Sequence, residues 1–216
     1  MARTPGSDGT ATRRTILRTA ADVASVEGLD ALSIGRLAIE LGMSKSGLFA
    51  HFGSKESLQL ATIDEARQRY VREVIAPGLA SGTGITRLLG LCESFLSYVE
   101  RDVFPGGCFF ASAMVEFDCK PSGAVRALVV DCQAQWMSTL ERAAGDAVSK
   151  GDLSTGTDPS QLAFELEASL LSGNWYFHLF GEAEYLQRAR RAVRSQLASE
   201  ATAAGHRSLA AGPPRG

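Results

Sequence analysis

Hydrophobic residues along this 216-residue chain recur every three or four positions, which is the spacing of one face of an α-helix. In the first strongly periodic segment, Ile16, Ala20 and Ala24 follow one another at four-residue intervals. No segment shows the strict alternation of a half-buried strand, and the chain carries no convincing internal repeat. The pattern predicts an all-α fold.

Helix start and stop residues divide this pattern into elements. Serine and aspartate favour the position before a helix, glycine favours the position after it, and proline interrupts helices. On these signals we expect helices over residues 12–27, 34–41, about seven residues after Ser44, from Ser54 to Pro77, 85–101, 109–117, 122–150, 159–180 and 184–197. The segments 1–10 and 199–216 are rich in small and polar residues, so we expect both to be disordered.

The helix expected after Asp158 differs from the others because its sequence, LAFELEASLLSGNWYFHLF, is apolar on nearly every side. A helix of this kind needs partners all round. Near the end of a chain of this length, the pattern indicates an interface between subunits.

Composition limits the class of protein. Hydrophobic residues make up 45% of the chain, enough for a substantial core, but the longest apolar runs are far short of the roughly 20 residues that cross a bilayer. The first residues lack the apolar stretch of a signal peptide. We therefore expect a cytoplasmic protein that does not associate with membranes.

The four cysteines form no CxxC pair and have no histidines at the spacing of a zinc site. We accordingly expect neither a disulfide framework nor a bound metal, and most of these thiols should be buried as small hydrophobic groups.

Charge is distributed unevenly along the chain. Residues 1–56 carry seven Lys and Arg against six Asp and Glu, a net charge of +1, whereas residues 57–185 carry nine against seventeen, a net charge of −8. Residues 186–216 carry six against one. Within the first twenty residues, four arginines face a single aspartate, which is a local excess that a phosphate backbone would attract.

The short helices over 34–41 and after Ser44 are joined by a turn of about three residues that contains Gly42, as in a helix-turn-helix. Leu37 is placed to pack on the first helix, and Leu48 is placed to anchor the third helix from beneath. The outer side of the third helix then carries mostly small residues, which suits a helix that lies in a major groove about 12 Å wide. The alternative is a capped helical hairpin without any contact to DNA.

The block LSIGRLAIELGMSKSGLFAHFGSKESLQLATID carries several coupled features: Ser33 at a helix start, Gly42 in the turn, an aromatic-x-His-Phe motif at Phe49 to Phe52, and Ser54-Lys55-Glu56 at the next helix start. With the amphipathic helix before it, this block resembles the DNA-binding domain of the TetR family of transcriptional regulators. The close resemblance covers about a quarter of the chain.

The resemblance implies a domain organisation and a set of DNA contacts. Residues 11–57 would form the helix-turn-helix DNA-binding domain and residues 58–198 a helical effector-binding and dimerisation domain. The implied contacts to double-stranded operator DNA are Arg13, Arg14, Ser33, Arg36, Ser44, Lys45, Ser46, Gly47, Phe49, His51 and Lys55. Phe49 stands where the family often has tyrosine, so a phosphate hydrogen bond from a hydroxyl is lost at this position.

The resemblance further implies a homodimer that binds a palindromic operator and that a small-molecule effector of unknown identity releases. The candidate effector contacts are Phe95, Tyr98, Phe110, Met114, Phe117, Trp136 and Trp175. The candidate dimer contacts are Leu166, Leu170, Trp175, Phe177, Leu186 and Val193. An excess of acid in this half of the chain would suit a cationic effector, through Glu116 or Asp118, although surface acid explains it as well.

Two other functions stay open at this stage. Cys108 precedes a short helix whose N-terminal dipole could lower its pKa, as in a redox sensor. A helical-bundle enzyme or carrier would need convergent catalytic groups, but the chain has three histidines, no HExxH or Glu-x-x-His pair, and no phosphate-binding loop. We expect neither enzymatic activity nor a cofactor.

Overall fold

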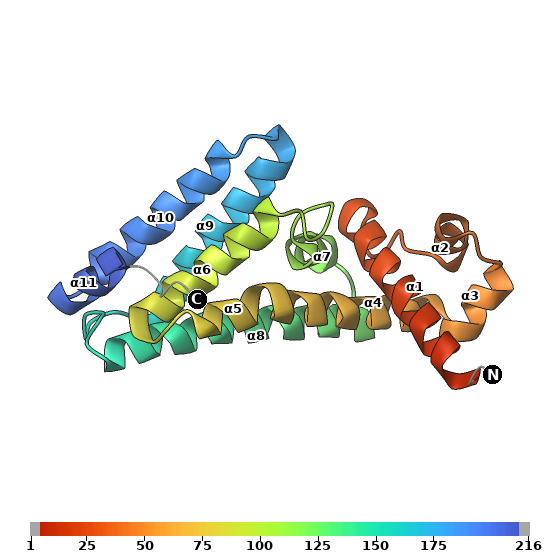
Figure 1. Cartoon of the computed structure of the whole chain (residues 1–216), viewed down its shortest axis with the longest axis horizontal. Coiled ribbons are helices and arrows are strands. Elements are labelled where there is room, and N and C mark those ends of the chain that lie inside the picture. Colours follow the sequence, from red (N-terminus) through yellow and green to blue (C-terminus); the bar gives the residue numbers. More distant parts are fainter. Residues whose placement is uncertain (1–4, 212–216) are drawn as a thin grey trace, which may run out of the picture. The chain divides into compact units, whose positions relative to one another are not determined.

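The computed structural model describes the backbone of residues 5–211 and the side chains of residues 11–211. Across these residues, every element of secondary structure is a helix, apart from an isolated β-bridge between Leu153 and Ala201 (Figure 1). The all-α prediction is confirmed.

The helices follow one another along the chain as α1 (Pro5–Glu27), α2 (Ile34–Leu41), α3 (Lys45–Phe52), α4 (Lys55–Tyr70), a π-helical stretch (Val71–Ile75), α5 (Ala76–Ala80), α6 (Gly84–Glu100), α7 (Phe109–Phe117), α8 (Ala124–Ser149), α9 (Pro159–Phe180), α10 (Glu184–Glu200) and α11 (Ala203–Ala211). They divide into two compact units. Unit 1 comprises the described parts of Met1–Arg69 together with Phe104–Cys132, and unit 2 comprises Tyr70–Val103 together with the described parts of Gln133–Gly216. The predicted second domain, 58–198, therefore contributes the segments 58–69 and 104–132 to unit 1.

In unit 1, three helices form the helix-turn-helix. The apolar face of α1 is buried, as are Leu37 of α2 and Leu48 of α3. Gly42 ends α2 with a φ of 61°, a left-handed conformation that glycine adopts without steric penalty. Met43 then donates its backbone N–H to the carbonyl of Ala38 over 2.9 Å, which closes the turn and sets the direction of α3.

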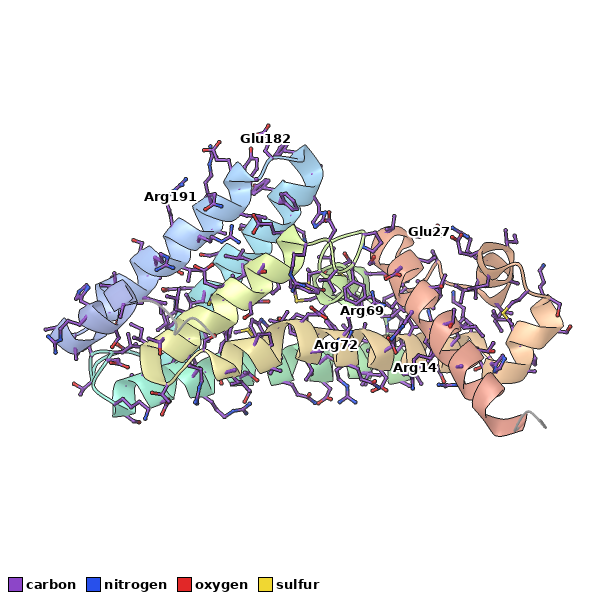
Figure 2. The ribbon with its side chains drawn as sticks, viewed as in Figure 1. Arg14, Glu27, Arg69, Arg72, Glu182 and Arg191 are labelled. Atoms are coloured by element: carbon purple, nitrogen blue, oxygen red, sulfur yellow. The ribbon has the colours of Figure 1, made fainter. Side chains whose placement is uncertain are left out.

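In unit 2, α9 and α10 form an antiparallel pair that packs on α6. Arg190 of α10 forms ion pairs with Glu93 at 3.1 Å and Glu100 at 2.6 Å, and Arg194 reaches Glu93 at 3.1 Å. Arg191 instead points outward from α10 (Figure 2). Much of the basic charge near the end of the chain is thus compensated inside unit 2.

The expected disorder of residues 199–216 was wrong for residues 199–211, which complete α10 and form α11. The reason is a set of hydrogen bonds to the distant Gly151–Asp152 segment. The Thr202 hydroxyl donates to the Gly151 carbonyl over 2.6 Å, and the Thr202 N–H donates to the Asp152 carbonyl over 2.9 Å. Residues 212–216 lie outside the described residues.

The N-terminal arm also differs from expectation, because α1 begins at Pro5 and not near residue 12. Proline suits the first turn of a helix, and adding residues to a helix that tertiary packing already holds is easy. Residues 1–4 of the expected arm lie outside the described residues.

Pro77 was expected to end the fourth helix, but helical structure continues to Ala80. Proline lacks a backbone N–H and crowds the preceding turn, and here the π-helical stretch Val71–Ile75 directly precedes the turn that contains it. The chain widens its helical turn at this point and does not break.

Gly106, in the loop before α7, packs closely against the backbone of Ser25, and a substitution at Gly106 tests how much this contact stabilises the fold. A Cβ atom at this position would lie 1.9 Å from the Ser25 carbonyl oxygen, and the Gly106 N–H donates to the Ser25 hydroxyl over 3.2 Å. We expect Gly106→Ala to lower the free energy of unfolding by about 1–3 kcal/mol, measured by urea denaturation. Gly123→Ala is the matched control, because a Cβ there meets nothing within 4 Å. Equal stabilities of the two variants would contradict the contact.

Candidate nucleic-acid interface

The third helix presents a narrow exposed face. Ser44 caps α3 by accepting the Gly47 N–H over 3.1 Å, and its hydroxyl lies 3.3 Å from that of Ser46. Leu48 and Phe52 are buried beneath the helix. Lys45 and the small residues of the first turn remain accessible on the other side, so backbone and side chains there can approach a base edge.

Phe49 is the large exception on this face, since 53% of its surface is exposed. His51 is half-buried beside Phe52, with 6.2 Å between the ring centroids. The Phe52 ring also lies under the Arg13 guanidinium at 5.2 Å, a cation–π contact that fixes this arginine of α1 near α3. Arg14, the neighbouring residue of α1, is exposed (Figure 2).

The Lys45 side chain lies beside Gly35, in the first turn of α2. A Cβ placed on Gly35 would lie 3.7 Å from the Lys45 ammonium and 4.0 Å from the Ser33 hydroxyl. That hydroxyl also accepts the Arg36 N–H over 3.1 Å and so caps α2. An ammonium group and a helix N-terminus at one place form a local positive site.

Arg36 and Lys55 each have carboxylate partners. Arg36 lies 2.7 Å from Glu27 and 2.7 Å from Glu40, and hydrogen bonds to these two acids, Glu27 foremost, raise its pKa. Lys55 donates to the backbone carbonyl of Asp30 over 2.5 Å and lies 3.2 Å from its carboxylate. A phosphate at Arg36 would have to compete with both glutamates, whereas Lys55 keeps an ammonium proton that no described residue accepts.

Family comparisons agree with this geometry. The model described as "Bacterial regulatory proteins, tetR family" matches residues 16–62, and the model described as "Tetracyclin repressor-like, C-terminal domain" matches residues 84–193. The chain belongs to the TetR family. Its N-terminal part is therefore a helix-turn-helix DNA-binding domain of a transcriptional regulator. No curated protein sequence matches the chain.

Solved structures of TetR-family regulators share this fold. A regulator from Chloroflexus aurantiacus J-10-FL is 26% identical, with a TM-score of 0.82 over 90% of this chain and 98% of that one. AibR, solved with isovaleryl coenzyme A and operator DNA, is 22% identical, with a TM-score of 0.65 over 85% and 96%. A putative regulator from Saccharomonospora viridis, solved with choline, is 23% identical, with a TM-score of 0.69 over 86% and 95%.

Three of the predicted effector contacts of this TetR-family chain lie together in unit 2. The ring of Phe95 stacks on Trp136 at 6.3 Å and lies 6.0 Å from Tyr98. Tyr70, which was not among the predicted contacts, lies edge-on to both Trp136 and Tyr98 at 5.6 Å. Tyr70 follows Ile63 and Ala66 at helical spacing, which marks a buried face of α4 but does not reveal which rings Tyr70 will contact.

A buried carboxylate adjoins these rings. Glu167 of α9 accepts hydrogen bonds from the Trp136 indole N–H over 2.6 Å and from the Gln133 amide over 3.1 Å. Burial raises the pKa of Glu167 against the opposing effect of these donors. Glu167 was not predicted, because the sequence does not reveal which of the two acids of this apolar helix, Glu165 or Glu167, other side chains will cover.

The remaining predicted effector contacts are not part of the cluster of Phe95, Tyr98 and Trp136. Phe110, Met114 and Phe117 belong to α7 in unit 1, and Trp175 is 43% exposed on α9. The suggestion that Glu116 attracts a cationic effector was wrong, because both of its carboxylate oxygens accept backbone N–H groups, from Leu29 over 2.7 Å and Asp30 over 2.5 Å.

The predicted dimer contacts need a larger correction. Leu166, Leu170 and Leu186 are completely buried within unit 2 and Val193 is 1% exposed, so these four side chains pack against their own chain and cannot meet a partner. Trp175 and Phe177 retain exposed surface. The exposed large hydrophobic residues of α9 are Trp175 together with four that were not predicted: Phe164, Tyr176, Leu179 and Phe180.

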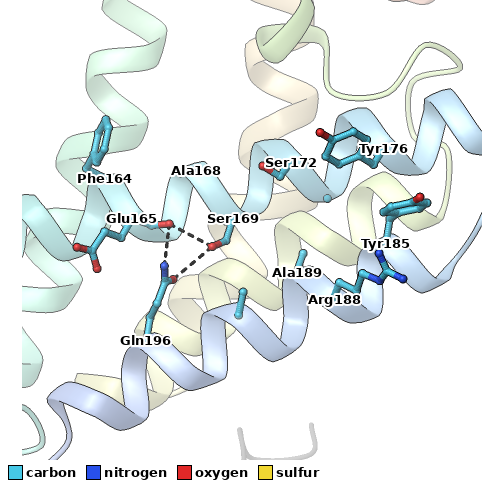
Figure 3. A pocket seen from close by; sticks show the side chains of 12 residues that line it. Phe164, Glu165, Ala168, Ser169, Ser172, Tyr176, Tyr185, Arg188, Ala189 and Gln196 are labelled. Atoms are coloured by element: carbon cyan, nitrogen blue, oxygen red, sulfur yellow. Dashed lines mark hydrogen bonds between the residues drawn. The ribbon is translucent and has the colours of Figure 1, made fainter.

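Beside these residues lies an open groove of about 500 Å³ between α9 and α10 (Figure 3). Its floor is made of small side chains, and its rim carries aromatic ones. The lining residues are Phe164, Glu165, Ala168, Ser169, Ser172, Gly173, Tyr176, Tyr185, Arg188, Ala189, Ala192 and Gln196.

Cys108 is 2% exposed, which argues against its use as a redox sensor. Reactive thiols lie in partly exposed, electropositive surroundings. Over the described part of the chain, no helix combines the length and apolarity needed to cross a bilayer. Within those same residues, no group of three acidic, histidine or cysteine side chains is arranged to hold a metal ion.

Gly47 tests whether the first turn of α3 is selected for contact with DNA. A Cβ there would lie 3.0 Å from the capping Ser44 hydroxyl, so the roughly 1 kcal/mol gained from alanine in a helix is offset by a crowded cap. We expect Gly47→Ala to change stability by less than about 1 kcal/mol while changing the sequence that the protein selects from a random DNA pool. Gly123→Ala should leave that sequence unchanged. Strong destabilisation by Gly47→Ala would show that the glycine serves packing.

Proposed function

We propose that this TetR-family regulator is a cytoplasmic, ligand-responsive repressor that binds a palindromic operator as a homodimer and leaves it when a small molecule binds. The observation that carries the proposal is the narrow accessible face of α3, flanked by Lys45 and Lys55 and held from beneath by buried side chains. Such a face fits a major groove, and the lysines suit the phosphates beside it.

The contacts to DNA divide into two groups. Ser44, Ser46 and Gly47 lie in the first turn of α3 with Lys45, where they can meet base edges. Phosphate contacts are proposed for the flanking residues Arg13, Arg14, Ser33, His51 and Lys55, with apolar contact from Phe49. Arg36 is the weakest member of the set, because Glu27 and Glu40 already compensate its charge.

The groove between α9 and α10 supports the homodimer. Ala168 and Ser172 of α9, with Ala192 of α10, leave room for a helix to approach, and the exposed Phe164 stands at the groove's edge. The same surface on two copies can pair about a two-fold axis, each copy supplying helices to the other's groove. A two-fold dimer would present two α3 helices about one turn of DNA apart, roughly 34–36 Å.

Effector binding is proposed at the cluster of Phe95, Tyr98 and Trp136, where buried aromatic side chains adjoin the polar Glu167. This combination of side chains suits a small apolar or amphipathic molecule. The similar proteins solved with isovaleryl coenzyme A and with choline bind chemically unrelated molecules, so they do not narrow the choice. Release from DNA requires that the effector bind the DNA-incompetent state more tightly.

Lys45→Ala and Lys55→Ala test the DNA contacts. Each lost phosphate contact should lower affinity for a duplex that the wild-type protein selects from a random pool, and should reduce the slope of log K against log salt by about one. Fluorescence anisotropy across a salt series measures both quantities. Lys150→Ala is the control, since Lys150 pairs with Asp146 in unit 2. Variants at 45 and 55 that bind like wild type would refute the assignments, and failure to select any sequence would favour an enzyme, a carrier or a purely structural dimer.

Phe164→Glu tests the dimer face. A buried charge facing an apolar partner is strongly unfavourable, so the variant should dissociate toward the 22.9 kDa monomer in sedimentation experiments and lose affinity for the two-fold operator. Val130→Glu places the same charge on an exposed hydrophobic position of α8 and should leave the mass unchanged. If both variants remain dimeric, the partner uses another surface.

A further inference from the structure

The turn between α1 and α2 is held by a residue from far along the chain. Glu116, near the end of α7, accepts the consecutive backbone N–H groups of Leu29 and Asp30 with its two carboxylate oxygens, over 2.7 and 2.5 Å. Two charge-assisted hydrogen bonds to adjacent amides fix the position and the orientation of the turn.

Asp30 in this turn is a shared partner of two lysines. Lys55 lies 3.2 Å from one carboxylate oxygen and Lys120 lies 2.6 Å from the other. Hydrogen bonds from Lys120 and then Lys55 lower the pKa of Asp30, so it is ionised at neutral pH. With the Glu116 carboxylate, which is bonded to the same turn, the four charges sum to zero, so an anion is attracted by the Lys55 ammonium itself and not by a net charge of the group.

The contacts with Asp30 orient the Lys55 ammonium group but leave one of its protons available for a further hydrogen bond. Its ammonium group has three protons, of which the carbonyl and the carboxylate of Asp30 receive two. Among the described residues, none accepts the third. A lysine held in this way loses little side-chain freedom when it meets a phosphate, which improves the net affinity of the contact.

Other contacts fasten the same region. The Gln59 amide donates to the Leu29 carbonyl over 2.9 Å in a buried position. Arg69 pairs with Asp22 of α1 at 2.6 Å, and its guanidinium lies over the ring of Phe104 at 4.4 Å. Phe104, Glu116 and Lys120 all belong to residues 84–193, which match the C-terminal family model, yet they cluster with the DNA-binding helices in unit 1.

We propose that Glu116 and Lys120 are positioning residues for DNA binding: through the α1–α2 turn and Asp30 they hold Lys55 in the orientation in which it receives a phosphate. The inference rests on the proposed contact of Lys55 with DNA. Displacement of α7 would free the turn, release Lys55 and weaken DNA binding without any change in the recognition helix.

A double-mutant cycle in the full-length protein tests this positioning. Glu116→Gln is nearly isosteric but turns an amide donor toward a backbone N–H. It should weaken binding of the selected duplex about tenfold at 0.15 M salt and reduce the salt slope by about one. In a Lys55→Ala background, Glu116→Gln should change the affinity less than twofold, because the residue it positions is gone.

Asp118→Asn is the matched control. It removes the same negative charge from an exposed position two residues away and should leave binding unchanged or slightly stronger. Both variants remove one negative charge, so a loss of DNA affinity in Glu116→Gln but not in Asp118→Asn comes from positioning and not from net charge. Circular dichroism and thermal melting establish that each variant is folded.

Lys120→Gln provides a second test of the positioning role, which does not depend on whether Glu116→Gln folds. It leaves Asp30 to neutralise Lys55 alone, so binding should weaken several-fold with Lys55 present and less than twofold with Ala at 55. Equal weakening in both backgrounds, by either variant, would overturn the positioning role. Failure of the wild-type protein to select any duplex would instead overturn the proposed function itself.

Discussion

The structure of the DNA-binding part depends on burial, because its key helices are too short to be stable alone. Helices α2 and α3 have eight residues each, below the roughly 12–15 at which isolated helices become marginally stable in water. Leu37 and Leu48 have no exposed surface, and they bind these helices to the rest of unit 1. The outward face of α3 is therefore set by the residues underneath it, and its own sequence is free to be small and polar.

Unit 1 also ties these short helices to a segment from far along the chain. The two family models divide the chain into a DNA-binding domain and a C-terminal domain. The compact units of the structure do not follow that division. The segment 104–132 belongs to the C-terminal family match and folds with the N-terminal helices. Its ties are polar and specific, as in Gly106 against Ser25 and Arg69 against Phe104, so a small displacement changes defined contacts.

Local features of the fold could be predicted from the sequence, and long-range ones could not. Ser33, Ser44 and Asp158 each cap a helix as expected, because a cap depends on neighbours a few residues away. Leu166 was assigned to the dimer interface and is buried in its own unit, since periodicity identifies an apolar face without revealing which helix covers it. Tyr70 and Glu167 were missed for the same reason.

The bond between Glu116 and the α1–α2 turn constrains the sequence at one end only. Every amino acid except proline offers the same backbone N–H, so the identity of residue 30 is immaterial to this particular bond. Position 116, by contrast, requires a carboxylate on a side chain of the right length. Substitutions in the α1–α2 turn therefore leave these hydrogen bonds in place, whereas substitutions at position 116 remove them. A comparison of side-chain pairs alone would not reveal that the two sites are joined.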